Sequence, residues 1–148
     1  MKIIREHGHI EALANILRGR KLPMTVSWVQ GASRSDAQNR LSQAWYTDIS
    51  TQLGDMTHED VRATCKLQFG MPILCRDNAA FNDTYQRTLA PLSYEQRIEA
   101  IRVFDIPVTR LMLVKQMTEY LDNMQRYWSQ QGVRLTDPEA LKYQEEFM

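Results

Sequence analysis

The stretch that decides the fold reads GASRSDAQNRLSQAW and runs from Gly31 to Trp45. Ser35 is placed as a helix N-cap, because its hydroxyl can accept from the Gln38 amide while the Gln38 side chain reaches back to the Ser35 amide. Asp36 then puts a carboxylate at the positive end of the helix dipole. The sequence therefore predicts a helix that begins at Asp36 and ends at Gly54. Its apolar positions recur at four-residue steps: Leu41, Trp45, Ile49 and Leu53.

The residues before this helix predict two short strands and a helix between them. The alternating run from Met24 to Val29 is typical of a strand, with Trp28 on its core side, and residues 2–5 read as an earlier strand. Apolar residues at helical spacing predict a helix from Gly8 to Arg18. The expected fold class is α+β, with a strand-helix-strand opening and a small sheet, followed by a mainly helical bundle.

The rest of the chain is expected to be mostly helical. Thr57 and Ser93 are N-cap residues of further helices. Residues 71–75 are apolar and expected to be extended, and residues 76–90 are expected to be irregular. The longest predicted helix runs from about Leu113 to Gln131. Its apolar face comprises Val114, Met117, Leu121, Met124 and Trp128; Gly132 then ends it, and Asp137 and Pro138 start a final acidic helix.

Composition indicates a single globular domain, residues 1–148, with 43% hydrophobic and 24% charged residues. No apolar run is long enough to cross a membrane, and no signal-peptide core is present, so a cytoplasmic location is expected. Cys65 and Cys75 fit no metal-ligand pattern and are expected to be reduced thiols. Eighteen basic and eighteen acidic residues give zero net charge, which argues against a uniformly basic surface but allows local phosphate contacts.

The sequence contains no recognisable catalytic motif. His7 and His9 lack the further ligands that a metal site needs, so neither a metal nor another cofactor is expected. Scattered acids such as Asp48, Asp55 and Asp60 could assemble a two-metal nuclease site. Solvation of helix surfaces explains those acids more simply. An enzyme is therefore not expected, and a metal-dependent nuclease stays an alternative.

If the protein binds nucleic acid, arginines would contact phosphates and aromatic rings would stack on unpaired bases. Arg34 and Arg40 flank the cap at Ser35, and Gln38 and Asn39 can donate to phosphate or sugar. Of the two nearby aromatic residues, Tyr46 is favoured over Trp45 for stacking or for extruding a base, because Tyr46 lies off the apolar stripe. Further phosphate candidates are Arg18, Arg20 and Lys21 at the end of the first helix, and Arg110, Arg126 and Arg134 around the longest one; for Arg126 a solvated helix face is the simpler reading.

Two motifs in this order resemble the phage NinB family, the Orf-type recombination proteins of lambdoid phages. The first is Arg34-Ser35-x-x-Gln38-Asn39-Arg40, followed by a helix carrying an aromatic residue. The second is Thr109-Arg110-Leu-Met112, which leads into the long amphipathic helix. The resemblance covers most of the chain except residues 71–105, which differ in length and composition.

This resemblance implies an accessory protein of phage or prophage recombination. Such a protein would bind single-stranded, branched or distorted DNA, assist the loading of a recombinase and use no cofactor. It would form a homodimer and contact the host single-strand-binding protein. An alternative is a protein-interaction adaptor without strong DNA affinity, which would use an exposed Met and aromatic surface on the longest helix.

Overall fold

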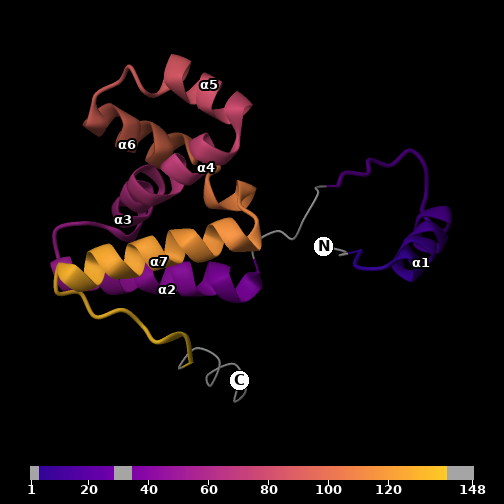
Figure 1. Ribbon diagram of the computed structural model, residues 1–148, viewed down its shortest axis with the longest axis horizontal. Helices are drawn as coiled ribbons and strands as arrows, with labels where there is room; N and C mark the ends of the chain where they lie inside the picture. The colour runs from indigo at the N-terminus through magenta and orange to yellow at the C-terminus, as the bar shows by residue number, and fades with distance from the viewer. Residues whose placement is uncertain (1–3, 29–34, 140–148) are drawn as a thin grey trace. The chain divides into compact units, whose positions relative to one another are not determined.

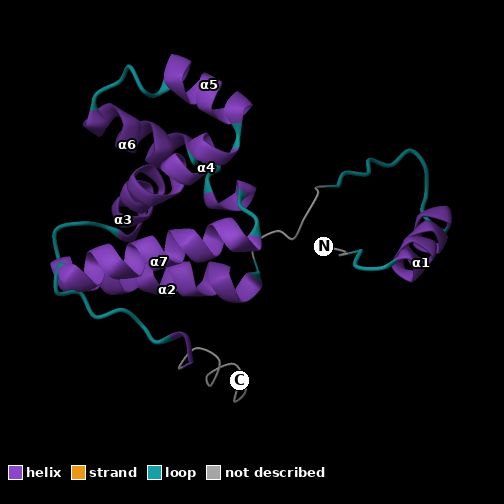
Figure 2. Cartoon of the chain, viewed as in Figure 1, coloured by secondary structure: helices purple, strands orange, loops and turns teal. Residues whose placement is uncertain are grey.

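The computed structural model describes residues 4–28 and 35–139, and the chain divides into two compact units, residues 1–32 and residues 33–148. Within the described ranges every regular element is a helix and no strand is present (Figure 2). The prediction of an α+β fold with a small sheet is therefore wrong for this part of the chain. Alternation of apolar residues favours a strand only when a neighbouring strand completes its hydrogen bonds, and residues 24–28 have no such partner.

In the first unit, helix α1 (His7–Arg18) confirms the helix predicted from Gly8 to Arg18. None of its residues is buried. The Gly19 amide donates to the Ile16 carbonyl at 3.2 Å, with an ordinary right-handed backbone at Gly19. Trp28, which was expected in the core, is 86% exposed. That expectation is wrong, because the predicted sheet that would have covered Trp28 is not formed.

In the second unit, the two longest helices, α2 (Asp36–Leu53) and α7 (Val114–Gln130), lie side by side and run in the same direction (Figure 1). The capping box of Ser35 and Gln38 is confirmed, and α2 ends at Gly54 with φ of 79°. The left-handed conformation at Gly54 and Gly132 is one that glycine adopts without steric cost. The predicted limits of both long helices are therefore confirmed to within one or two residues.

Helix α3 (His58–Cys65) begins after Thr57, the expected N-cap, which forms a capping box with Asp60. It continues without a break into a π-helical turn, Lys66–Gly70, and then into α4 (Met71–Asp77). The prediction that residues 71–75 are extended is wrong. Pro72 stands in the first turn of α4, where a missing amide hydrogen costs little, and a short apolar run suits a buried helix as well as a strand.

Helix α5 (Ala79–Thr88) occupies the segment that was expected to be irregular. Asn78 caps it, its side-chain oxygen accepting from the Phe81 amide at 3.0 Å. The polar residues that suggested a loop therefore include the cap of a helix. Helix α6 (Tyr94–Phe104) follows, with the predicted capping box at Ser93, and a short 3-10 turn η2 (Thr109–Leu111) leads towards α7.

The core of the second unit lies where α2, α3, the π-helical turn, α4 and α7 meet. Its largest fully buried side chains are Tyr46, Tyr120, Lys66, Ile49, Met71, Ile101, Met112, Met117 and Met124. Pro138 and Glu139 begin a helical turn after Asp137, and the remainder of the predicted final helix lies outside the described residues. No helix among the described residues has both the length and the apolar character needed to span a membrane.

Candidate functional site

The predicted site at the start of α2 is only partly available to a ligand. The Gln38 side chain accepts from the Ser35 amide at 3.1 Å and donates to the Val114 carbonyl at 3.2 Å and to Thr118 Oγ1 at 3.0 Å. Its amide group therefore holds α2 against α7. The Asn39 carbonyl accepts from Ser42 Oγ at 2.7 Å, and the Asn39 residue is half-buried.

The arginines predicted around this corner are distributed over different parts of the chain. Arg40 is exposed on α2, whereas Arg34 lies outside the described residues. Three further candidates, Arg18, Arg20 and Lys21, are exposed but belong to the first unit. Of these five basic residues, Arg40 alone is described within the second unit.

The two predicted stacking residues are buried. Tyr46 is 1% exposed, and its hydroxyl lies 2.7 Å from that of Tyr120. Trp45 is 3% exposed, and its indole Nε1 donates to the Thr136 carbonyl at 2.8 Å. A ring must be accessible to stack on a base, so the prediction for both residues is wrong. Helix α2 contacts α3 as well as α7, so its buried face is wider than one four-residue stripe.

The Met and aromatic surface expected on α7 is also buried. Met117 and Met124 are 0% exposed, and Trp128 is 6% exposed. Tyr127 is partly accessible but packs against Phe69, with ring centroids 5.4 Å apart. The adaptor surface predicted on this helix is therefore not available, because α7 uses its apolar face to build the core.

At the end of α6, Asp105 has both an unfavourable backbone conformation and an unfavourably placed charge. Asp105 ends α6 with φ of 48° and ψ of 52°, the one left-handed residue other than glycine in the described ranges. A carboxylate at a helix C-terminus also faces the negative end of the helix dipole. Both features cost free energy locally, so other contacts must hold Asp105 in place.

Three cations surround the Asp105 carboxylate. Arg62 Nη2 lies 3.0 Å from Oδ1, and Lys66 Nζ lies 3.6 Å from the same oxygen. Arg110 Nη2 lies 3.6 Å from Oδ2 and donates to the Asp105 carbonyl at 3.1 Å. The charge of Arg62, followed by those of Lys66 and Arg110, lowers the pKa of Asp105. Arg62 also pairs with Glu59 at 3.2 Å, and these three cations and two carboxylates leave the group with a net charge of +1.

Lys66 is the buried member of this group, with a side chain that is 2% exposed. Burial, with the positive charge of Arg62, lowers its pKa to about 8, and the attraction of Asp105 only partly opposes this. Lys66 opens the π-helical turn, and Gly70 closes it. A Cβ at Gly70 would lie 2.7 Å from Val108 Cγ1. The absence of a side chain at Gly70 therefore lets the segment after α6 approach the turn closely.

Apolar residues that lie close to Asp105 and Arg110 in the chain are exposed. Phe104, which immediately precedes Asp105, is 77% exposed, Val103 is 60% exposed, and Leu111, next to Arg110, is 51% exposed. We call this group of residues the Asp105 corner; it comprises Arg62, Lys66, Val103, Phe104, Asp105, Arg110 and Leu111. Among its members only Arg110 was a predicted site residue. The spacing of Ile98, Ile101 and Phe104 predicts one apolar helix face, but Phe104 is the last residue of α6 and is exposed.

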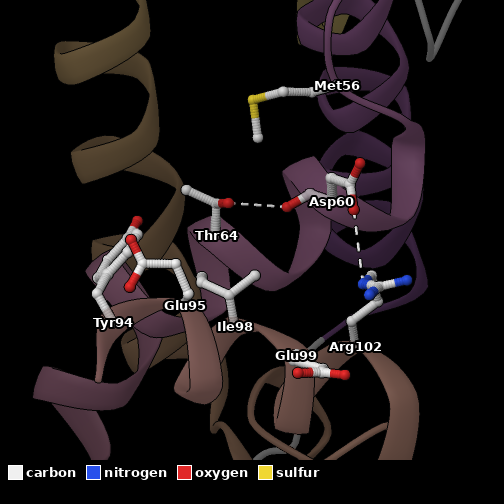
Figure 3. A pocket seen from close by; sticks show the side chains of 8 residues that line it. All are labelled: Met56, Asp60, Thr64, Tyr94, Glu95, Ile98, Glu99 and Arg102. Carbon is white, nitrogen blue, oxygen red and sulfur yellow. Dashed lines mark hydrogen bonds and ion pairs between the residues drawn. The ribbon is translucent and has the colours of Figure 1, made fainter. Parts of the chain in front are cut away.

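The open groove between α3 and α6 has a different character. It measures about 550 Å³ and is lined by Met56, Asp60, Thr64, Tyr94, Glu95, Ile98, Glu99 and Arg102. In Figure 3 the Asp60 carboxylate points towards Arg102, to which it is paired at 3.6 Å. Hydrogen bonds from Thr57 lower the pKa of Asp60. Because three acids face a single arginine here, the groove repels phosphate.

Neither the side chains nor the comparisons assign a known activity. Within residues 4–28 and 35–139, no three His, Cys, Asp or Glu side chains are grouped so that they could hold a metal ion. Asp48, one acid of the nuclease alternative, accepts from the Thr136 amide at 2.6 Å and from its hydroxyl at 2.7 Å. Comparisons with protein-family models, curated proteins and solved structures found no match to the chain.

Proposed function

We propose that this protein binds single-stranded or distorted DNA without strong sequence preference, through the Asp105 corner, as an accessory protein of phage recombination. The single observation that carries the proposal is that Phe104, whose ring is exposed, directly precedes the Asp105 carboxylate that three cations surround. The resemblance of two sequence motifs to the NinB family supports the recombination role. The homodimer and the contact with a host single-strand-binding protein are further proposals from that resemblance.

The chemistry of the corner suits a flexible polyanion. An aromatic ring can stack on any base, and such stacking contributes about 1–3 kcal/mol per base. Arg110 is half-exposed and has further N–H donors beyond those directed at Asp105, so it can meet a phosphate oxygen at the same time. Since these charges are local, zero net charge does not oppose the proposal.

A single strand fits this corner better than an intact duplex. The Phe104 ring can meet only a base whose face is uncovered, and bases inside a duplex are covered by their neighbours. Distorted or branched DNA offers such bases at lower unstacking cost. We therefore expect the affinity to fall in the order single strand, mismatched duplex, intact duplex.

The test is fluorescence anisotropy with labelled oligo-dT at several salt concentrations. We expect Phe104→Ala to weaken binding by about 5- to 150-fold, the equivalent of one stacked base. Arg110→Ala should weaken binding and reduce the slope of log K against log salt by about 0.7. Arg87→Ala is the matched control, because Arg87 is exposed on α5 and its Nε donates to the Asp83 carbonyl of the same helix.

A comparison variant, Arg40→Glu, separates this location from the start of α2. If Arg40→Glu weakens binding while Phe104→Ala and Arg110→Ala bind like the parent, the Asp105 corner is the wrong site. If none of the three variants changes binding, both locations are wrong. If the parent shows no binding to any of the three DNA forms, the proposed function itself fails.

A further inference from the structure

The first unit of the chain combines positive charge with exposed apolar side chains. Residues 1–32 contain five Lys or Arg and two Glu, a net charge of +3, whereas the remaining residues have a net charge of −3. From Arg18 to Trp28 the sequence has three cations, Arg18, Arg20 and Lys21, and no acid. All three cations are exposed. The zero net charge of the whole chain therefore conceals a basic N-terminal unit.

The aromatic residue of this basic segment is the most exposed large apolar side chain in the described ranges. Trp28 is 86% exposed, and Leu22 is 71% exposed. Trp28 stands seven positions after Lys21, and a fully extended chain would span at most about 25 Å over those seven steps. A few nucleotides of a single strand cover that distance. The segment therefore carries the two kinds of side chain that bind single strands: cations for the phosphates and an uncovered aromatic ring for a base.

We infer that the first unit makes its own contact with single-stranded nucleic acid, in which Trp28 stacks on a base and Arg18, Arg20 and Lys21 meet phosphates. This inference rests on the proposed function in one respect, that DNA is the ligand, and it deepens that function by adding a binding element separate from the Asp105 corner. The contact uses residues of the first unit only.

An anionic membrane surface would also attract these three cations. The backbone of residues 21–28, however, favours nucleic acid over a membrane as the ligand. Residues 21–28 form neither helix nor strand and are drawn as loop in Figure 2. Their amide and carbonyl groups would lose water on entering lipid without gaining hydrogen bonds within the segment. Stacking on a base covers only the indole ring and leaves the backbone in water. This segment without helix or strand therefore suits a strand of nucleic acid better than a lipid interface.

The tryptophan distribution provides a direct readout in the full-length protein. The chain has three tryptophans, of which Trp45 and Trp128 are 3% and 6% exposed. Emission that responds to a large ligand will therefore come mainly from Trp28. We expect oligo-dT to quench the parent's tryptophan emission, and the Trp28→Phe variant to lose this quenching while it still binds the labelled oligonucleotide.

Two sets of substitutions test how much the Trp28 ring and the three cations contribute to binding. Trp28→Ala should weaken oligo-dT binding by about 5- to 150-fold, the range for one stacked base. The combined variant Arg18→Gln, Arg20→Gln and Lys21→Gln should lower the slope of log K against log salt by about 2, since each phosphate contact to a single strand contributes about 0.7. Arg87→Gln on α5 is the control, and we expect it to keep the parent's slope.

The outcomes separate this inference from the Asp105 corner. If oligo-dT still quenches tryptophan emission in the Phe104→Ala variant, the inference is supported, even where the tests of the Asp105 corner show that DNA does not bind there. Binding by anisotropy without any change in Trp28 emission overturns the inference and leaves the proposed function standing. A blue shift with vesicles containing phosphatidylserine, with no response to oligo-dT, also overturns it and assigns the unit to a membrane surface.

Discussion

Arg62 Nη2 lies 3.0 Å from Asp105 Oδ1 and ties the C-terminal end of α6 to the middle of α3. This ion pair joins two residues that are far apart in the sequence, and Lys66 and Arg110 complete the group around the same carboxylate. The pair balances the unfavourable backbone and dipole energies of Asp105. It also keeps cationic groups around the residue that directly follows Phe104, whose ring is exposed.

Replacing the central carboxylate should shift stability and binding in opposite directions. Asp105→Asn keeps a side chain that tolerates the left-handed region but removes the counter-charge of Lys66. We expect the free energy of unfolding to fall by about 1–2 kcal/mol in urea titrations. We also expect tighter oligo-dT binding, because the corner gains one positive charge. Asp122→Asn, on an exposed position of α7, is the control; equal DNA affinity for parent and Asp105→Asn would contradict the role of the corner.

The lowered pKa of Lys66 predicts how the free energy of unfolding depends on pH. Its folded pKa of about 8 lies below the ordinary value of 10.5, so between these pH values the unfolded chain binds more protons than the folded chain. The Lys66 contribution to stability therefore rises with pH across this window. Lys66→Met should match or exceed the parent's stability at pH 7, because a buried charge is removed.

The measurement is the free energy of unfolding of both proteins at several pH values. We expect the advantage of Lys66→Met to shrink as pH rises from 8 towards 10.5. Lys115→Met, an exposed position on α7, should track the parent at every pH. A constant gap between Lys66→Met and the parent would show that Lys66 stays protonated throughout.

Gly70 is expected to be intolerant of any side chain. Gly70→Ala would place a Cβ 2.7 Å from Val108 Cγ1, and we expect a loss of about 1–3 kcal/mol in stability through overpacking. In a Val108→Ala background the same substitution should cost less, because the clashing methyl group is gone. Gly8→Ala is the control, since a Cβ there meets nothing within 4 Å. Equal costs in both backgrounds would place the origin of the effect elsewhere.

The Tyr46 and Tyr120 hydroxyls should be energetically coupled. They lie 2.7 Å apart and are buried, and burial raises the pKa of both phenols. Tyr46→Phe should cost about 1–2 kcal/mol, because the Tyr120 hydroxyl loses its partner. The double variant with Tyr120→Phe should cost less than the sum of the single variants in a double-mutant cycle. Additive costs would mean that the hydroxyls do not depend on each other.

The starts of three helices of the second unit could be predicted from the sequence. Ser35, Thr57 and Ser93 are the N-caps that the sequence predicts, and each makes a capping box with a residue three positions further on. A contact of this kind depends only on the local backbone, so residue identity and spacing are enough. The strand predicted at Met24 failed because a strand depends on a distant partner that no local pattern specifies.

The candidate site was mostly decided by tertiary structure. Sequence periodicity identified an apolar stripe on α2, but the packing of α3 and α7 determines that Tyr46 is buried as well. The residues around Asp105 come from α3, the π-helical turn, the end of α6 and η2, and only packing brings their charges together. Local hydrogen bonds thus fix where helices begin, whereas burial and charge clusters depend on contacts between segments far apart in the chain.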